Sequence, residues 1–384
     1  VFALPFILFA MAGGYVADRY RKRTVVINTK IMEVAVMALG ALGLYLQNLP
    51  LLLVVVFLMS VQSAFFGPSK YSLLPEMLPE SKLSWGNGIL SLGTFMAIIT
   101  GGITAGALSQ NLTGNDAWWA GIGLVGLALA GWAGSLGILN LPPANPQKQF
   151  KLNFFGDIWT NLKQIRQDRV LLLAISGSVY FWFLGALFGE PTILVYSKDL
   201  LHLDDTQVGM IRACLAIGIG LGSAGAGVLS GKKIEYGLVP LGALGLAVCA
   251  GLLALPGLSA VHVGLVLGLL GFSGGFYMVP INALIQHRPD PKNKGSVIAT
   301  ESWLTSVGIF GASGVFWLMK TQMGLAPTTI FAVGAVVTFA ATIYAVAIVP
   351  DSLMRLVLWI LTHTFYRVRV EGRENIPERG GALF

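Results

Sequence analysis

Six polar or ionisable residues lie inside stretches of the sequence that are otherwise apolar, and they are the best candidates for chemistry. They are Asn87, Glu190, Arg212, Asn282, Gln286 and Glu301. Burying an ionisable or amide group in apolar surroundings is costly, so such a group is by default a functional hypothesis. We therefore predict that these side chains line a ligand-binding cavity between helices.

Each of these residues also has a plainer interpretation. Glu190 and Arg212 predict an ion pair that lines the cavity, but both also fit a position near a water interface that their side chains can reach. Glu301 either faces the cavity or stands at a helix start, where the helix dipole favours negative charge. Asn282 and Gln286, four residues apart on one helix face, suit a ligand contact or, as we favour, an interhelical hydrogen bond. Asn87 has the same two interpretations, a ligand contact or an interhelical hydrogen bond.

Several other kinds of chemistry have no support in the sequence. The two cysteines, Cys214 and Cys249, have no CxxC or Cys/His neighbours, and the four histidines are scattered. We therefore expect no metal site and no disulfide framework. No nucleotide-binding pattern of the type GxxxxGK[ST] occurs, and the Gly-rich run at 218–227 lies inside an apolar stretch, where it favours close helix packing. We expect no cofactor.

The composition predicts an all-α protein embedded in a membrane. Hydrophobic residues make up 55% of the chain and charged residues 11%, and the mean hydropathy is +0.74. An ordinary soluble domain has roughly a quarter of its residues charged. Eleven apolar runs are long enough to span a bilayer. They are approximately 1–17, 25–46, 50–67, 85–108, 117–140, 170–197, 207–230, 238–256, 260–285, 296–319 and 326–349.

The basic residues predict how these spans are oriented. Sixteen Lys and Arg residues fall in alternate connections, and the opposite set holds only Lys198 and Lys320. Cytoplasmic connections retain Lys and Arg, so residue 1 should lie on the outer side and residue 350 on the inner side. This topology accounts for the net charge of +7, and we expect no nucleic-acid partner.

The chain divides into four parts on this basis. Residues 1–140 hold five spans, 141–169 form a polar cytoplasmic linker, and 170–350 hold six spans. Residues 351–384 change to interleaved arginines and aromatic residues, which suits a juxtamembrane segment. An odd number of spans with an outer start leads us to expect that one preceding span is missing from this sequence.

A loop motif follows the first span and returns in weaker form in the second half. The first copy is GGYVADRYRKR at 13–23, and the second is GVLSGKK at 227–233. Glycines allow close helix approach, the aspartate can pair with a base or cap a helix, and the basic residues anchor the loop at the inner interface. The residues that we expect to matter are Gly14, Asp18, Arg19, Arg21, Lys22, Arg23, Gly227, Lys232 and Lys233.

This motif resembles the loop signature of the major facilitator superfamily. The resemblance implies two pseudo-symmetric helical bundles with a substrate site between them near the bilayer midplane. The sequence departs from the signature at Arg21, where a glycine is usual, and at Gly231, which stands where the first copy has its aspartate. We therefore do not expect an equivalent charged contact in the second half.

Two further segments resemble the lysophospholipid transporter branch of that superfamily. They are FGPSKYSLLPE at 66–76 and GGFYMVPINALIQ at 274–286. The resemblance implies a multi-pass protein of the bacterial inner membrane that moves lysophospholipids to the cytoplasmic leaflet for re-acylation. An exporter of another small molecule or drug is the first alternative.

The C-terminal segment resembles the beginning of a glycerolipid acyltransferase domain. The likeness rests on YRVRVEGRENIP at 366–377 and GGALF at 380–384. No histidine in the chain has an aspartate five positions later, so the His-x4-Asp motif of that family is absent and this chain should not itself be an enzyme. The resemblance implies an acyltransferase partner in cis, and a membrane-anchored acyltransferase is the second alternative.

Overall fold

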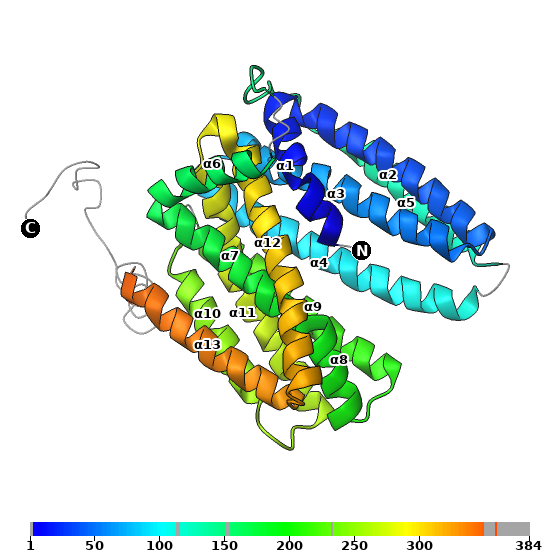
Figure 1. Ribbon diagram of the computed structural model, residues 1–384, viewed down its shortest axis with the longest axis vertical. Helices are drawn as coiled ribbons and strands as arrows, with labels where there is room; N and C mark the ends of the chain where they lie inside the picture. The colour runs from blue at the N-terminus through cyan, green and yellow to red at the C-terminus, as the bar shows by residue number, and fades with distance from the viewer. Residues whose placement is uncertain (1–2, 113–115, 150–153, 232, 349–357, 359–384) are drawn as a thin grey trace, which may run out of the picture.

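The computed structural model describes residues 3–112, 116–149, 154–231, 233–348 and 358, and all of its regular elements are helices (Figure 1). The N-terminal helices are α1 (Ala3–Arg19), α2 (Lys22–Tyr45), α3 (Leu49–Met77), α4 (Glu80–Asn111) and α5 (Trp118–Ser135). Next come α6 (Phe154–Gln167), α7 (Arg169–Leu187), η2 (Phe188–Thr192), α8 (Ile193–Val195), η3 (Tyr196–Leu200), α9 (Asp205–Leu229) and α10 (Leu238–Leu253). The last are α11 (Ala260–His287), η4 (Pro291–Asn293), α12 (Lys294–Trp317), η5 (Leu318–Gln322) and α13 (Pro327–Ile348).

The predicted apolar spans correspond to these helices. Nine helical segments of the described chain are long and apolar enough to cross a membrane, α10 is a shorter apolar helix, and α1 has 17 residues. In lipid every backbone group must be satisfied within its own segment, so an apolar run of spanning length becomes a helix. The all-α membrane fold is therefore confirmed.

Polar residues in the connections begin several of these helices. Asn48 accepts a hydrogen bond from the backbone N–H of Leu51 at the start of α3, and Ser259 caps α11 in the same way. Asp204 forms a reciprocal capping box with Gln207 at the start of α9. Each cap satisfies backbone N–H groups that have no partner inside the helix.

One predicted boundary is wrong. The third span was expected to end near residue 67, but α3 continues through Pro68 and Pro75 to Met77. Prolines remove backbone hydrogen bonds, yet membrane helices tolerate them because neighbouring groups satisfy the freed carbonyls. The added turns carry Ser69, Lys70 and Tyr71 into the interior of the bundle.

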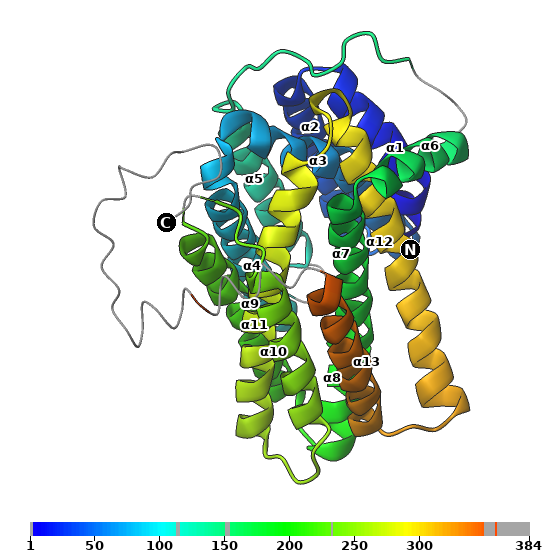
Figure 2. The same ribbon diagram turned by 90° about the vertical axis from the view of Figure 1, so that its left-hand side faces the viewer.

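The helices form two groups that meet at one end (Figures 1 and 2). Helices α1–α5 make the N-terminal group and α7–α13 the C-terminal group, and the groups contact each other chiefly through α1 with α12 and α4 with α9. The predicted inner connections come together here, through the ion pairs of Lys22 with Glu76 and of Arg288 with Asp168 and the contact of Asp18 with Gly295. We call this the basic end.

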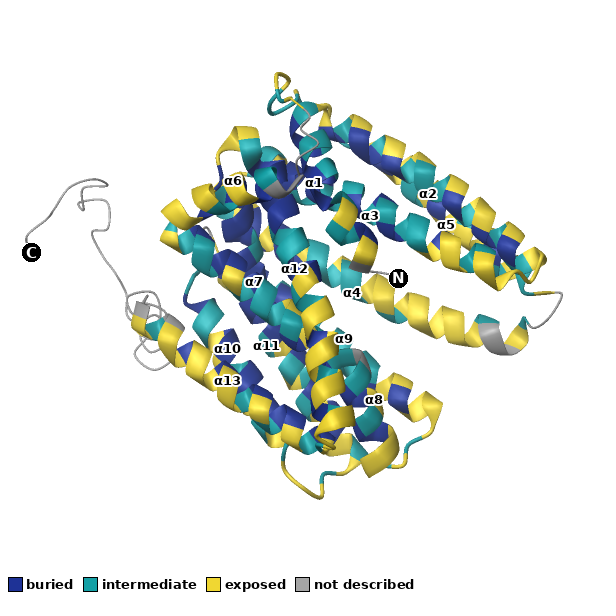
Figure 3. Ribbon diagram, viewed as in Figure 1, coloured by how far each residue is buried: buried dark blue, intermediate teal, exposed yellow. Residues whose placement is uncertain are grey.

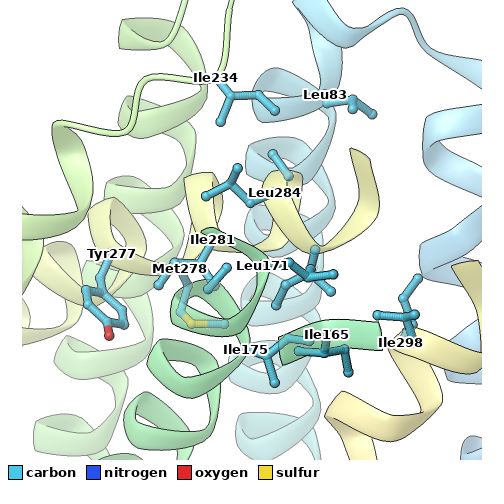
Figure 4. Close-up of a cluster of buried hydrophobic side chains, with 14 of the residues drawn as sticks. Leu83, Ile165, Leu171, Ile175, Ile234, Tyr277, Met278, Ile281, Leu284 and Ile298 are labelled. Atoms are coloured by element: carbon cyan, nitrogen blue, oxygen red, sulfur yellow. The ribbon is translucent and has the colours of Figure 1, made fainter. Parts of the chain in front are cut away.

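Apolar packing between the groups is concentrated at the basic end. A buried cluster there joins Leu83 of α4 to Ile165 of α6, Leu171 of α7, Leu284 of α11 and Ile298 of α12 (Figure 4). At the other end α4 is almost entirely exposed from Met96 to Ala107 (Figure 3). The two groups are thus closed against each other at the basic end only.

Candidate functional site

Asp18 fastens the two groups together at the basic end. Its carboxylate is fully buried; Oδ1 accepts from the backbone N–H of Gly295 at 2.7 Å, and Oδ2 from the N–H and hydroxyl of Ser296 at 3.0 and 2.9 Å. These donors stand in the first turn of α12, where the helix dipole favours a negative charge. The side chain therefore bridges the end of α1 and the start of α12.

The linker between the groups adds to this fastening. Lys148 Nζ donates to Asp18 Oδ2 at 2.7 Å and to Ser296 Oγ at 2.5 Å, and Asn161 on α6 donates to Thr300 Oγ1 at 2.9 Å. Arg19 in turn donates to the backbone carbonyl of Lys148 at 2.7 Å. We call Asp18, Lys148 and Ser296 the latch. Nothing in the sequence indicated Lys148 or Ser296 as partners of Asp18, because they lie 130 and 278 positions away from it.

Glycines allow the close approach that the latch needs. A Cβ on Gly14 would lie 2.5 Å from that of Ala299, so α1 and α12 meet there with only a hydrogen atom between them. On the other side of the basic end, Gly88 of α4 meets Ser223 and Gly227 of α9 in the same way. Small residues at helix crossings serve this purpose in membranes.

The other motif residues form local contacts. Lys22 pairs with Glu76 at 2.5 Å, Arg23 donates to the carbonyl of Leu136 at 2.9 Å, and Arg21 is exposed beside α2. In the second copy Lys233 lies 3.4 Å from Glu235 on the surface. Lys232 lies outside the described residues.

Two of the predicted amides bind each other across the groups. Asn87 of α4 and Gln286 of α11 are both buried and exchange two hydrogen bonds of 2.8 Å. Asn87 also donates to the carbonyl of Leu83 at 3.0 Å. The structure therefore places Asn87 and Gln286 in an interhelical hydrogen-bonded pair.

A cavity of about 230 Å³ lies against this amide pair, between the two groups. Its polar lining comes from Tyr71, Asn282, Gln286, Glu301, Ser302, Thr305 and Ser306, and its apolar lining from Phe6, Trp182, Met278, Ile285, Ile298 and Ile309. Three of the six predicted site residues, Asn282, Gln286 and Glu301, therefore line one cavity. Asn87 is hydrogen-bonded to Gln286. The cavity suits a molecule that has both a polar and an apolar part.

Glu301 supplies the carboxyl group of this lining. Its Oε1 accepts hydrogen bonds from Ser178 Oγ of α7 at 2.5 Å and from Thr305 Oγ1 at 3.1 Å. Among the described residues no Lys, Arg or His side chain pairs with it. The carboxyl group is therefore held by neutral hydroxyl groups.

The predicted Glu190 and Arg212 ion pair is not tested by the structure. Residue 190 belongs to the π-helical turn η2, but its side chain lies outside what is described. Arg212 stands two turns into α9 and is partly buried, and it is not part of the lining of the cavity described above. The pairing of these two residues stays a prediction.

Lys70 is a basic residue next to the cavity, and the candidate set did not include it. Its Nζ lies 5.3 Å from the ring centre of Tyr71, which lines the cavity, and 5.9 Å from that of Phe66. Lys30 Nζ lies over the same Phe66 ring but pairs with Glu33 at 2.7 Å. In the described part of the chain Lys70 has no such carboxylate. Lys70 was not among the candidates because it falls between the predicted spans 50–67 and 85–108, in an expected connection.

Comparison with known families decides what kind of protein this is. Residues 1–313 match the family model described as the Major Facilitator Superfamily. The chain belongs to this family. It is a multi-pass membrane transporter. In the described residues no group of three or more His, Cys, Asp or Glu side chains comes together to hold a metal.

Relatives and solved structures agree with this assignment. The chain is 29% identical to the lysophospholipid transporter LplT of Cronobacter sakazakii, over 75% of this chain and 70% of the relative. It is also 29% identical to LplT of Salmonella typhimurium, over 79% and 73%. The fold resembles that of the human organic anion transporter MFSD10, with a TM-score of 0.75 at 16% identity over 89% of this chain and 81% of that one. The E. coli fucose:proton symporter FucP gives 0.68 at 15%, over 89% and 88%.

Proposed function

We propose that this transporter moves lysophospholipids across the bacterial inner membrane to the cytoplasmic leaflet. The observation that carries the proposal is the cavity between the two groups, which combines a polar set of side chains with an apolar one. A lysophospholipid has a charged headgroup and one acyl chain, and it needs both kinds of lining. The relatives named as lysophospholipid transporters support the same cargo.

Lys70 is the group that we assign to the phosphate of the headgroup. It is a cation inside the bundle that has aromatic rings but no carboxylate beside it in the described chain. A cation in such a position gains most from an anionic ligand, because charge-assisted hydrogen bonds strengthen away from water. Tyr71 connects it to the cavity.

The basic end is assigned to the cytoplasm, following the distribution of Lys and Arg. With the latch formed, the cavity is closed toward that side, so the lipid would enter from the opposite side. Opening of the latch would then release it to the inner leaflet. Alternating access of this kind is rocking of one helical group against the other around a fixed site.

Re-acylation by an acyltransferase in cis completes the proposal. The resemblance that supports it lies in residues 366–384, outside the described residues. Covalent coupling would raise the effective concentration of the delivered lipid at the next active site.

A flipping assay in proteoliposomes tests the cargo. The purified full chain should move a fluorescent lysophosphatidylethanolamine between leaflets, measured by dithionite quenching, while protein-free vesicles do not. Lys70→Gln should raise the apparent KM about tenfold to hundredfold, as expected for one hydrogen bond to a charged group. Lys163→Gln is the matched control, because Lys163 also lies over an aromatic ring, Trp159, but on the helix α6 outside the cavity.

The same assay separates the alternatives. Absence of lipid movement together with efflux of a drug such as ethidium would replace this proposal by the exporter. Loss of lipid movement only when residues 351–384 are removed from a correctly folded protein would favour an acyltransferase anchor.

A further inference from the structure

We propose that an anionic diacyl phospholipid of the inner leaflet binds to the outer surface of the C-terminal group, in a groove between α6, α7 and α12. One acyl chain lies along α7, and Arg166 and Arg169 bind the phosphate. This lipid is a bound component of the transporter and not its cargo, so the inference goes beyond the proposed function.

The groove has the length and the surface that an acyl chain requires. Its volume is about 440 Å³, and α7 supplies most of its lining. The α7 residues recur at the spacing of one helix face, and they are Leu172, Ile175, Ser176, Val179, Tyr180 and Phe183. The first and last of them are about 16 Å apart along the helix axis. This length is close to half of the roughly 30 Å hydrocarbon thickness of a bilayer, so the groove matches the acyl region of one leaflet.

The groove is separate from the cavity between the two helical groups. Trp182 of α7 lines that cavity, and Ser178 donates a hydrogen bond to Glu301 there. Neither Trp182 nor Ser178 lines the groove. On the groove side, the hydroxyl group of Tyr180 is hydrogen-bonded to Thr338 Oγ1 of α13 at 2.8 Å. The groove and the cavity therefore lie on different faces of α7.

Two arginines stand at the end of the groove that belongs to the basic end. Arg166 follows Leu162, a groove residue of α6, by one helical turn on the same face. Arg169 precedes Leu172, the first groove residue of α7, by one turn. Both arginines are exposed, and in the described part of the chain neither has a carboxylate at ion-pair distance.

The carboxylate closest in sequence does not neutralise these arginines. Asp168 lies between them, but it accepts a hydrogen bond from Arg288 Nε at 2.7 Å and others from the backbone N–H groups of Val170 and Leu171. Arg169 is also the first residue of α7, where the helix dipole disfavours a positive charge. A phosphate bound here would therefore offset two positive charges that the protein leaves uncompensated.

Helix α6 has the character of a helix at a membrane surface. It has 14 residues and lies crosswise to α7 and α12 at the basic end (Figure 2). Ile158 and Ile165 are buried beneath it, whereas Trp159 is 58% exposed. Tryptophan and basic residues are typical of membrane interfaces, and basic pockets between helices on the cytoplasmic side suit anionic headgroups. The groove therefore fits a lipid of the phosphatidylglycerol type.

The buried face of α6 connects this site to the latch region. Asn161 donates to Thr300 Oγ1 at 2.9 Å, and Ile158 packs against Met11 of α1 and Ala299 of α12. A lipid that holds α6 against α7 and α12 stabilises these contacts. Binding to the folded protein should therefore appear as a rise in melting temperature.

The test measures lipid binding to the purified full chain. Protein freed of lipid in a nonionic detergent is titrated with phosphatidylglycerol or phosphatidylethanolamine. Melting temperature and lipid adducts in native mass spectrometry are recorded. Phosphatidylglycerol should act at lower concentration, because it alone brings a net negative charge. In Arg166→Gln/Arg169→Gln its apparent Kd should rise about thirtyfold, or about fivefold for each basic residue.

Two further variants separate the groove from the overall charge. Ser176→Trp places a large side chain at an exposed position of the groove, so it should abolish the rise with phosphatidylglycerol and leave the lipid-free melting temperature unchanged. Lys82→Gln/Lys292→Gln removes the same charge from two exposed lysines of the basic end that do not line the groove. Its apparent Kd should stay within a factor of two of the parent value.

Four outcomes would overturn the inference. Equal affinity for the two lipids would show that charge is not recognised, and unchanged binding in both groove variants would place the lipid elsewhere. An equal loss in the lysine control would reduce the effect to general attraction by the basic end. Dimers that Ser176→Trp dissociates would make a second copy of the chain the occupant. Because no transport is measured, failure of this inference is distinguishable from failure of the proposed cargo.

Discussion

Replacing Asp18 by Asn should open the basic end of the transporter. The carboxylate accepts four hydrogen bonds, three from the start of α12 and one from Lys148, and it is fully buried. An asparagine keeps one acceptor for the N–H of Gly295. Its amide group then places donors against the N–H of Ser296 and the ammonium of Lys148.

The size of the effect follows from these contacts. Breaking a buried charge pair by removing one partner costs about 3–5 kcal/mol. The lysine is one-fifth exposed, and solvent screening there favours the lower figure of about 3 kcal/mol. Since about 1.4 kcal/mol is a factor of ten, the equilibrium should shift about a hundredfold toward the open basic end.

Distance measurements between spin labels can detect this shift. Labels at Tyr20 and Lys233, both exposed at the basic end in different helical groups, report the separation of the groups after Cys214 and Cys249 are replaced by serine. In Asp18→Asn the distance distribution should gain a longer component.

Asp168→Asn is the matched control for this measurement. It removes a carboxylate at the same end, but one whose partner Arg288 belongs to the same helical group. Its label distances should equal those of the parent. If Asp18→Asn also left the distribution unchanged, the latch would not hold the two groups together and the reasoning from its geometry would be refuted.

Two further predictions concern other contacts at the basic end. Asn87→Leu or Gln286→Leu alone should lower the free energy of unfolding by about 1–3 kcal/mol, because each leaves the other buried amide without its partner. The double variant should lower it by less than the sum of the two single effects. Additive effects in thermal melting would contradict the pairing. Partial burial acts to raise the pKa of Asp168, but the hydrogen bond and charge of Arg288 and two backbone N–H groups hold it below its ordinary value. This carboxylate is ionised above its unfolded pKa of about 3.9, so the pair stabilises there and is lost as pH falls through the lower folded pKa. The difference in melting temperature between the parent and Arg288→Gln should be constant from about pH 7 to 5 and shrink below about pH 4; a difference that already shrinks near pH 6 would exclude this pair as the cause.

The sequence by itself determined the helices and the class of protein. In lipid each span satisfies its own backbone, so local composition is sufficient to locate it, as at α9 and α13. The same local rule selected Glu301, Asn282 and Gln286, which line one cavity, because a polar residue in an apolar run is visible without knowledge of its neighbours. It misplaced the end of α3, because Pro68 and Pro75 stop a helix in water but not inside a bundle.

Only the tertiary structure decided which polar groups meet. Asp18 and Ser296 are 278 positions apart, and Asn87 and Gln286 are 199 apart. Such pairs depend on how each helix is rotated about its axis and where it crosses its neighbour. Those quantities are set by side-chain packing between segments and by close glycine contacts such as Gly14 with Ala299, and not by the composition of any one span.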